Sequence, residues 1–81
     1  MAINFQTGLD INRLNNTVAN YKLTPYYKGE DSYLIMSSNT LLAIKAANTN
    51  HLVAHEGNYY TYGWLTIAIS ERLNIGEIEF R

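Results

Sequence analysis

Apolar residues recur along two stretches of the chain with the spacing of a helical face. The first stretch contains, at intervals of three, four and three residues, Ile11, Leu14, Val18 and Tyr21. On a helix these positions form one narrow stripe, which is typical of an amphipathic helix packed on a core. We therefore expect a helix over about 8–22, with Thr7 as its N-cap and Asp10 three residues later. Pro25 should end it, because the residue before a proline avoids helical torsion angles.

The second stretch, 64–74, is apolar around most of a helical circumference. Its apolar residues after Trp64 are Leu65, Ile67, Ala68, Ile69 and Leu73. A helix of this kind is buried on two sides or lies at an interface, and Gly76 is placed to end it. The alanine-rich segment 40–47 predicts a third, short helix that Asn48 would terminate in a left-handed conformation. A strand meander through 40–47 is the alternative.

The remaining apolar segments have strand length or strand alternation. They are 2–6, 33–36, 51–56, 59–62 and 77–81. The run 33–36 is predicted to be the central strand, and Gly57–Asn58 to turn a hairpin between 51–56 and 59–62. The cluster 28–31 predicts another hairpin turn. In 77–81, Ile78 and Phe80 should point inward, and the charged residues between them suit an edge strand.

These elements together predict an α+β fold in a single domain, 1–81. We expect about four to five short strands in a mainly antiparallel sheet. Two main helices, at about 8–22 and 64–74, would pack on it, with 40–47 as the third. A chain of 81 residues buries about 60% of its unfolded surface, so the core is small.

Tyrosine is the most informative residue type for function. The chain has seven tyrosines and one tryptophan. Tyr21 and Tyr33 are expected in the core, but neighbours in a strand point to opposite faces, so each of the pairs Tyr26–Tyr27 and Tyr59–Tyr60 must turn one ring outward. Exposed tyrosines are favoured at protein contacts. The predicted partner-binding residues are therefore Tyr26, Tyr27, Tyr59, Tyr60 and Tyr62.

Asparagine supplies a second candidate surface. Asn12, Asn16 and Asn20 lie on the polar face of the first predicted helix. Asparagine is a poor helix former, which favours a role in hydrogen-bonded recognition, although a simply solvated face explains the same pattern. We include these three residues in the predicted partner-binding set.

Charge and composition narrow the function further. Charged residues make up 16% of the chain, the net charge is −1, and cysteine is absent. The scattered lysines disfavour a nucleic-acid binder, and a thiolate site is excluded. No leader or membrane-spanning pattern occurs, so we expect a cytoplasmic protein that does not enter a membrane.

Residues with catalytic potential are present but do not form a recognisable motif. His51 and His55 would lie about 13 Å apart along one strand, too far to share a metal ion. The serines are not placed in a nucleophile elbow, and Glu30–Asp31 lies in a predicted turn. We expect no cofactor and no metal.

The first hypothesis is a non-enzymatic protein-binding module whose partner is another protein or a second copy. Small, low in charge and rich in Asn and Tyr, the chain resembles accessory proteins of phages and mobile elements that bind host complexes and block them sterically. One alternative is a single-stranded nucleic-acid-binding domain that uses the same aromatic residues. Another is a small ligand-binding domain or enzyme, with His51 or His55 in a deep pocket.

Overall fold

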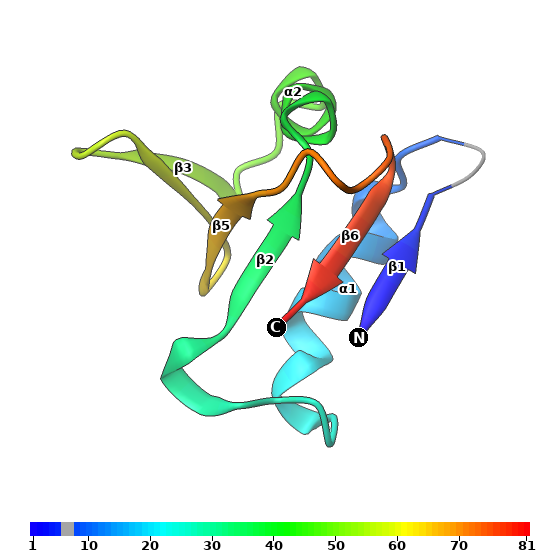
Figure 1. Cartoon of the computed structure of the whole chain (residues 1–81), viewed down its shortest axis with the longest axis vertical. Helices are drawn as coiled ribbons and strands as arrows, with labels where there is room; N and C mark the ends of the chain where they lie inside the picture. The colour runs from blue at the N-terminus through cyan, green and yellow to red at the C-terminus, as the bar shows by residue number, and fades with distance from the viewer. Residues whose placement is uncertain (6–7) are drawn as a thin grey trace.

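The computed structural model describes residues 1–5 and 8–81, whose strands form one mixed six-stranded sheet (Figure 1). The elements, in chain order, are β1 (Ala2–Asn4), α1 (Ile11–Asn20), the 3₁₀ turns η1 (Tyr21–Leu23) and η2 (Gly29–Asp31), β2 (Tyr33–Met36), α2 (Ser38–Ala46), β3 (Leu52–His55), β4 (Tyr59–Tyr62), β5 (Leu65–Ile69) and β6 (Glu77–Phe80).

The strands are ordered β1-β6-β2-β5-β4-β3. β2 and β5 run parallel, and the other neighbours are antiparallel. The predicted α+β class is confirmed. The predicted strand count is too low, and the parallel pair at the centre of the sheet is not part of the prediction.

Both helices pack on the same face of the sheet. Alternate strand residues point to that face and are buried; they include Leu34, Met36, Leu65, Ile67, Ile78 and Phe80. Leu14 and Val18 of α1 and Ile44 of α2 belong to the same core cluster. In Figure 1, α1 lies behind β6 and β1. The opposite face, here called the open face, carries no helix within the described residues.

The first helix is confirmed but begins later than predicted. Asp10, and not a residue before it, is the N-cap, and its side chain accepts a hydrogen bond from the Arg13 amide at 3.1 Å. Thr7, the predicted cap, lies outside the described residues. Thr24 is extended, with ψ at 156°, which confirms that the helical segment ends before Pro25.

The short helix predicted over 40–47 is also confirmed, as α2. Its N-cap is Ser37, whose hydroxyl accepts from the Thr40 amide at 3.3 Å. Asn48 follows with φ at 56°, the left-handed conformation expected of its terminator. The alternative meander is thereby excluded.

The helix predicted over 64–74 is wrong, because this segment contains β5. Leu65 and Ile67 are buried while Thr66 and Ala68 are partly exposed, which is the period of a strand. Gly63, with φ at 59°, makes the tight turn from β4 and so places Leu65 opposite Tyr62. A strand inside a sheet is apolar on both faces, and such a run imitates an all-round apolar helix.

The other strand predictions have mixed outcomes. β2 is central, and β3 and β4 form the predicted hairpin. Ile78 and Phe80 are buried as expected, but β6 lies between β1 and β2 and is not an edge. The segment 28–31 contains η2 and is not a hairpin turn, because residues 24–28 before it form no strand. Of the predicted strand 2–6, residues 2–4 form β1 and Gln6 lies outside the described residues.

No helix in 1–5 or 8–81 has the length and apolarity needed to cross a membrane.

Candidate functional site

The predicted partner-binding residues do not form one surface. Tyr59 lies on the open face, whereas Tyr60 and Tyr62 alternate with it and point to the helix-covered face. Tyr26 and Tyr27 follow η1, beyond the C-terminal end of α1. Asn12, Asn16 and Asn20 are all exposed on α1, which covers the other side of the sheet.

Tyr62 is completely buried, and its predicted role as a surface contact is therefore wrong. It lies opposite Leu65 of β5, and its hydroxyl donates a hydrogen bond to Oδ1 of Asn15 on α1. Burial raises the pKa of the Tyr62 phenol above its ordinary value of 10.0. The residue ties α1 to the sheet.

The other two tyrosines of β4 are differently engaged. Tyr60 is half-buried, and the Lys45 Nζ of α2 lies 4.4 Å from its ring centroid. Tyr59 is 45% exposed and stacks on His55, with the ring centroids 4.8 Å apart and the planes 6° from parallel. Of this strand's tyrosines, Tyr59 is the one that presents its ring to solvent on the open face.

Trp64 organises an aromatic cluster beside α1. Its ring stacks on Tyr21 and meets Tyr27 edge-on, with centroid distances of 6.0 and 5.6 Å. The indole N–H donates to the Val18 carbonyl at 3.0 Å, and the Lys22 Nζ lies 4.6 Å above the ring. These contacts keep the Tyr27 ring packed against Trp64. Tyr26, which is 56% exposed, is therefore the residue of the pair that faces out.

A continuous row of uncharged side chains crosses the open face. The register places Tyr33 beside Thr66, Thr66 beside Thr61, and Thr61 beside Val53. Neighbouring strands are about 4.8 Å apart, so the row extends about 14 Å over β2, β5, β4 and β3. We call this row, Tyr33–Thr66–Thr61–Val53, the open-face stripe. At its two ends Tyr33 is 44% exposed and Val53 46% exposed.

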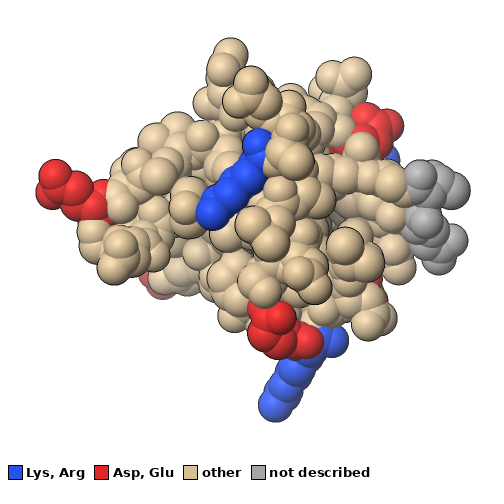
Figure 2. All heavy atoms as spheres, turned by 90° about the horizontal axis from the view of Figure 1, so that it is seen from above, with Lys and Arg blue, Asp and Glu red and all other residues tan. Residues whose placement is uncertain are grey.

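The neighbours of the stripe are also mostly uncharged. Ile35 and Ala68 are paired beside it, and Tyr59 lies two residues from Thr61 along β4, on the same face. The charged residues of the open face are at β6, where Glu79 forms an ion pair with Arg81 at 2.8 Å. Charged side chains are few elsewhere as well, and Figure 2 shows a mostly uncharged surface on the side seen from above.

The sequence patterns do not reveal the stripe, apart from its neighbour Tyr59. Tyr33 is expected in the core because 33–36 is apolar throughout. A signal is nevertheless present, since Thr61 and Thr66 alternate with the buried Tyr62 and Leu65. The mistaken helix at 64–74 conceals that alternation.

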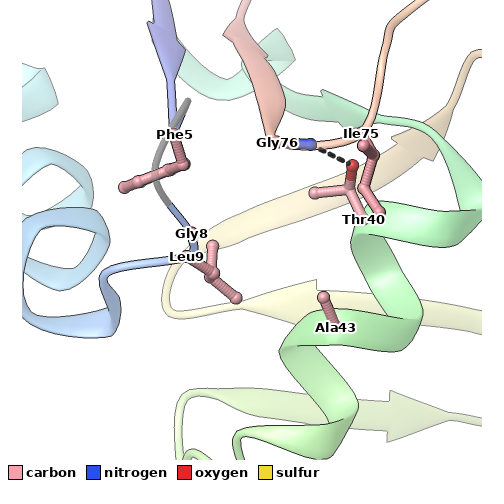
Figure 3. A pocket seen from close by; sticks show the side chains of 7 residues that line it. All are labelled: Phe5, Gly8, Leu9, Thr40, Ala43, Ile75 and Gly76. Carbon is pink, nitrogen blue, oxygen red and sulfur yellow. Dashed lines mark hydrogen bonds between the residues drawn. The ribbon is translucent and has the colours of Figure 1, made fainter.

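An apolar pocket of about 370 Å³ lies between α2 and the segments that flank β1 and β6 (Figure 3). Its lining residues are Phe5, Gly8, Leu9, Thr40, Ala43, Ile75 and Gly76. The Thr40 hydroxyl already accepts from the Gly76 amide at 3.1 Å. The described lining therefore lacks the several converging polar groups that orient a bound small molecule.

The residues with catalytic potential have structural roles. Ser37 is buried and caps α2, with its hydroxyl 3.0 Å from that of Thr40. His51 stacks on Tyr62, and the His55 Nε2 lies 2.7 Å from the Thr61 hydroxyl. Within the described residues, no three side chains of the metal-ligating types gather into one site.

Comparison with protein families, with curated proteins and with solved structures found no match.

Proposed function

We propose that the protein is a non-enzymatic binding module that contacts another protein through its open face. The observation that carries this proposal is the open-face stripe, a row of uncharged side chains on a sheet face that no described helix covers. Monomeric proteins rarely leave such a patch without a use, and Tyr side chains are enriched in protein contacts.

The shape of the surface favours a flat partner. Tyr33 and Tyr59 offer rigid rings, and Thr61 and Thr66 lie between them, with the Thr61 hydroxyl held by the His55 Nε2 at 2.7 Å. Rings of this kind supply contact area at a low cost in side-chain entropy. A module that covers a partner's surface in this way would inhibit that partner by steric blocking.

The charges argue against the nucleic-acid alternative. The open face carries Glu77 and Glu79, and Arg81 is paired with Glu79. Binding to a phosphate backbone depends on several unpaired Lys or Arg side chains along one groove. A labelled single-stranded oligonucleotide should therefore show no salt-sensitive binding.

The proposal is tested by affinity capture from the native cell or its host with immobilised protein. The double variant Tyr33→Ala/Tyr59→Ala should recover at least about tenfold less of the captured partner than the wild type, because hot-spot rings dominate binding energy. The matched control is Asn12→Ala/Asn16→Ala, which changes exposed residues of α1 and should capture as the wild type does. Thermal unfolding of both variants verifies the fold.

Two results would contradict the proposal. One is undiminished capture by the tyrosine variant. The other is loss of capture by the asparagine variant alone, which would move the binding site to α1.

A further inference from the structure

β3 is an edge strand whose outer side is unpaired within the described residues. It pairs with β4 on one side and ends the strand order of the sheet. Val53, Ala54 and His55 are all exposed. The opposite edge strand, β1, has three residues, whereas β3 has four.

The hydrogen-bond pattern of the hairpin shows which backbone groups of β3 point outward. The Gly63 amide donates to the His51 carbonyl at 3.0 Å, so these two residues form a hydrogen-bonded pair. In an antiparallel ladder such pairs alternate with non-hydrogen-bonded ones. Val53 and His55 therefore direct their N–H and C=O groups toward β4, and Leu52 and Ala54 direct theirs to the free edge.

This edge lacks most of the devices that protect natural edge strands from pairing. Those devices are a very short strand, Lys or Pro on the edge, an inward charge, a bulge, or a cover. The sequence of β3 is Leu-Val-Ala-His, which has neither Lys nor Pro, and the register with β4 runs without a bulge. When His55 is neutral, the β3 strands of two copies carry no charge and do not repel each other.

We propose that β3 pairs antiparallel with β3 of a second copy, on a two-fold axis that passes through Val53. In this register Leu52 of one copy faces Ala54 of the other, and both residues have outward N–H and C=O groups with which to bond. A two-fold axis perpendicular to the sheet keeps the two open faces on the same side. The pairing is thus self-complementary in hydrogen bonding, face and charge.

The dimer would lengthen the surface proposed for partner binding. Val53 is one end of the open-face stripe and would lie against Val53 of the second copy. The two stripes would then form one row that runs from Tyr33 to Tyr33 across the axis. The inference does not depend on the proposed partner, because the pairing uses the backbone of β3.

The contact is small, which sets the expected affinity. A four-residue strand from each copy buries far less than the roughly 1,000 Å² of a stable interface. Dimerisation is therefore expected at concentrations of about 100 µM, and sedimentation equilibrium should show a rise from the 9.2 kDa monomer toward twice that mass.

Two variants test the edge directly. Ala54→Pro removes an outward N–H and leaves the bonds to β4 in place, whereas Val53→Lys brings two positive charges together on the axis. Each should weaken the association at least about tenfold. The matched control Thr61→Lys changes the same stripe one strand away from the edge and should still dimerise. Circular dichroism and thermal unfolding establish that each variant is folded.

A cysteine variant tests the register, since the chain has no cysteine of its own. In the proposed pairing the two Val53 positions are a non-hydrogen-bonded pair with Cα atoms about 4.5 Å apart, within disulfide range. Val53→Cys should therefore cross-link under mild oxidation. Thr61→Cys should not, because its two copies would be about 14 Å apart.

Several outcomes overturn the proposal. They are a monomeric wild type at several hundred micromolar, a dimer that survives both Ala54→Pro and Val53→Lys, and equal cross-linking of the two cysteine variants. A further contrary outcome is that the wild type stays monomeric but pairs β3 with an added foreign peptide. That result would assign the edge to another partner and reject the dimer.

Discussion

Tyr62 shows how a single residue links the sheet to the helix. Its ring is buried in the core, and its hydroxyl bonds to Asn15 on α1. The surrounding apolar side chains disfavour the charged phenolate, and this raises its pKa. Folding is therefore coupled to the protonation of this one side chain at alkaline pH.

The coupling predicts a specific loss of stability in base. The pKa of Tyr62 is higher in the folded than in the unfolded chain, so its contribution is fully present below about pH 10 and is lost as pH rises through the folded pKa. We expect the free energy of unfolding to fall more steeply above pH 10 in the wild type than in Tyr62→Phe. Urea titrations between pH 8 and 11 measure this slope.

Tyr59→Phe serves as the control, because it removes the hydroxyl of an exposed tyrosine on the same strand. At neutral pH, Tyr62→Phe should cost about 1 kcal/mol for the lost hydrogen bond. Identical alkaline slopes in the wild type and Tyr62→Phe would contradict the prediction.

The connections between elements depend on backbone conformations that side-chain patterns do not reveal. Gly76, in the β5–β6 loop, has φ at 86°, and a Cβ there would lie 2.9 Å from the Phe5 carbonyl oxygen. The Phe5 amide in turn donates to the Gly76 carbonyl at 2.9 Å. This close approach holds the end of β1 against the start of β6.

Gly76→Ala should therefore be markedly destabilising. Gly29 supplies the matched control, because it also has φ at 86° but a Cβ there would meet no atom within 4 Å. Gly29→Ala should cost about 1 kcal/mol for the left-handed conformation, and Gly76→Ala at least about 2 kcal/mol, since backbone must also move. Thermal unfolding compares the two, and equal losses would show that the steric contact contributes nothing.

The elements also show what the sequence can and cannot predict. Helix α1 is predictable because its stripe and its stop before Pro25 are local properties, and α2 because its composition and Asn48 are local too. β5 is not, because its apolar run fits a buried strand and a buried helix equally well. The outcome is decided by pairing with β2, about thirty residues away, which no window of local sequence contains.

The candidate site is predictable to the same limited extent. Alternation correctly implies that one of Tyr59 and Tyr60 faces outward. It does not identify Tyr33, whose exposure follows from the absence of a described helix over the open face. Which of two sheet faces is covered is a property of helix placement, and it is not encoded at Tyr33 itself.

On the scale of the whole molecule, stability is expected to vary across the sheet. β2, β5 and β6 supply Leu34, Leu65 and Ile78, which are fully buried, whereas β3 is largely exposed. In Figure 1 the β3–β4 hairpin extends away from α1. Elements with few buried contacts open locally without global unfolding.

Native-state hydrogen exchange should therefore rank the strands. The amides of β3 and the outer part of β4 should exchange through openings of lower free energy than those of β2, β5 and β6. NMR in low concentrations of denaturant measures this gradient. Equal opening free energies in all six strands would contradict it. In addition, the outward amides of Leu52 and Ala54 should become protected as protein concentration rises if the dimer forms.

The pairing of β1 with β6 has a mechanical consequence. Ala2 lies opposite Glu79, so Met1 and Arg81 are side by side at one end of the same ladder (Figure 1). A force applied between them would load the hydrogen bonds of the ladder one at a time, starting with those nearest the termini, as in unzipping. Pulling instead on residues 33 and 69, at opposite ends of the parallel β2–β5 pair, loads that ladder in shear, with its bonds sharing the tension. The protein should thus unfold at a low force when pulled by residues 1 and 81, and at a higher force when pulled by residues 33 and 69.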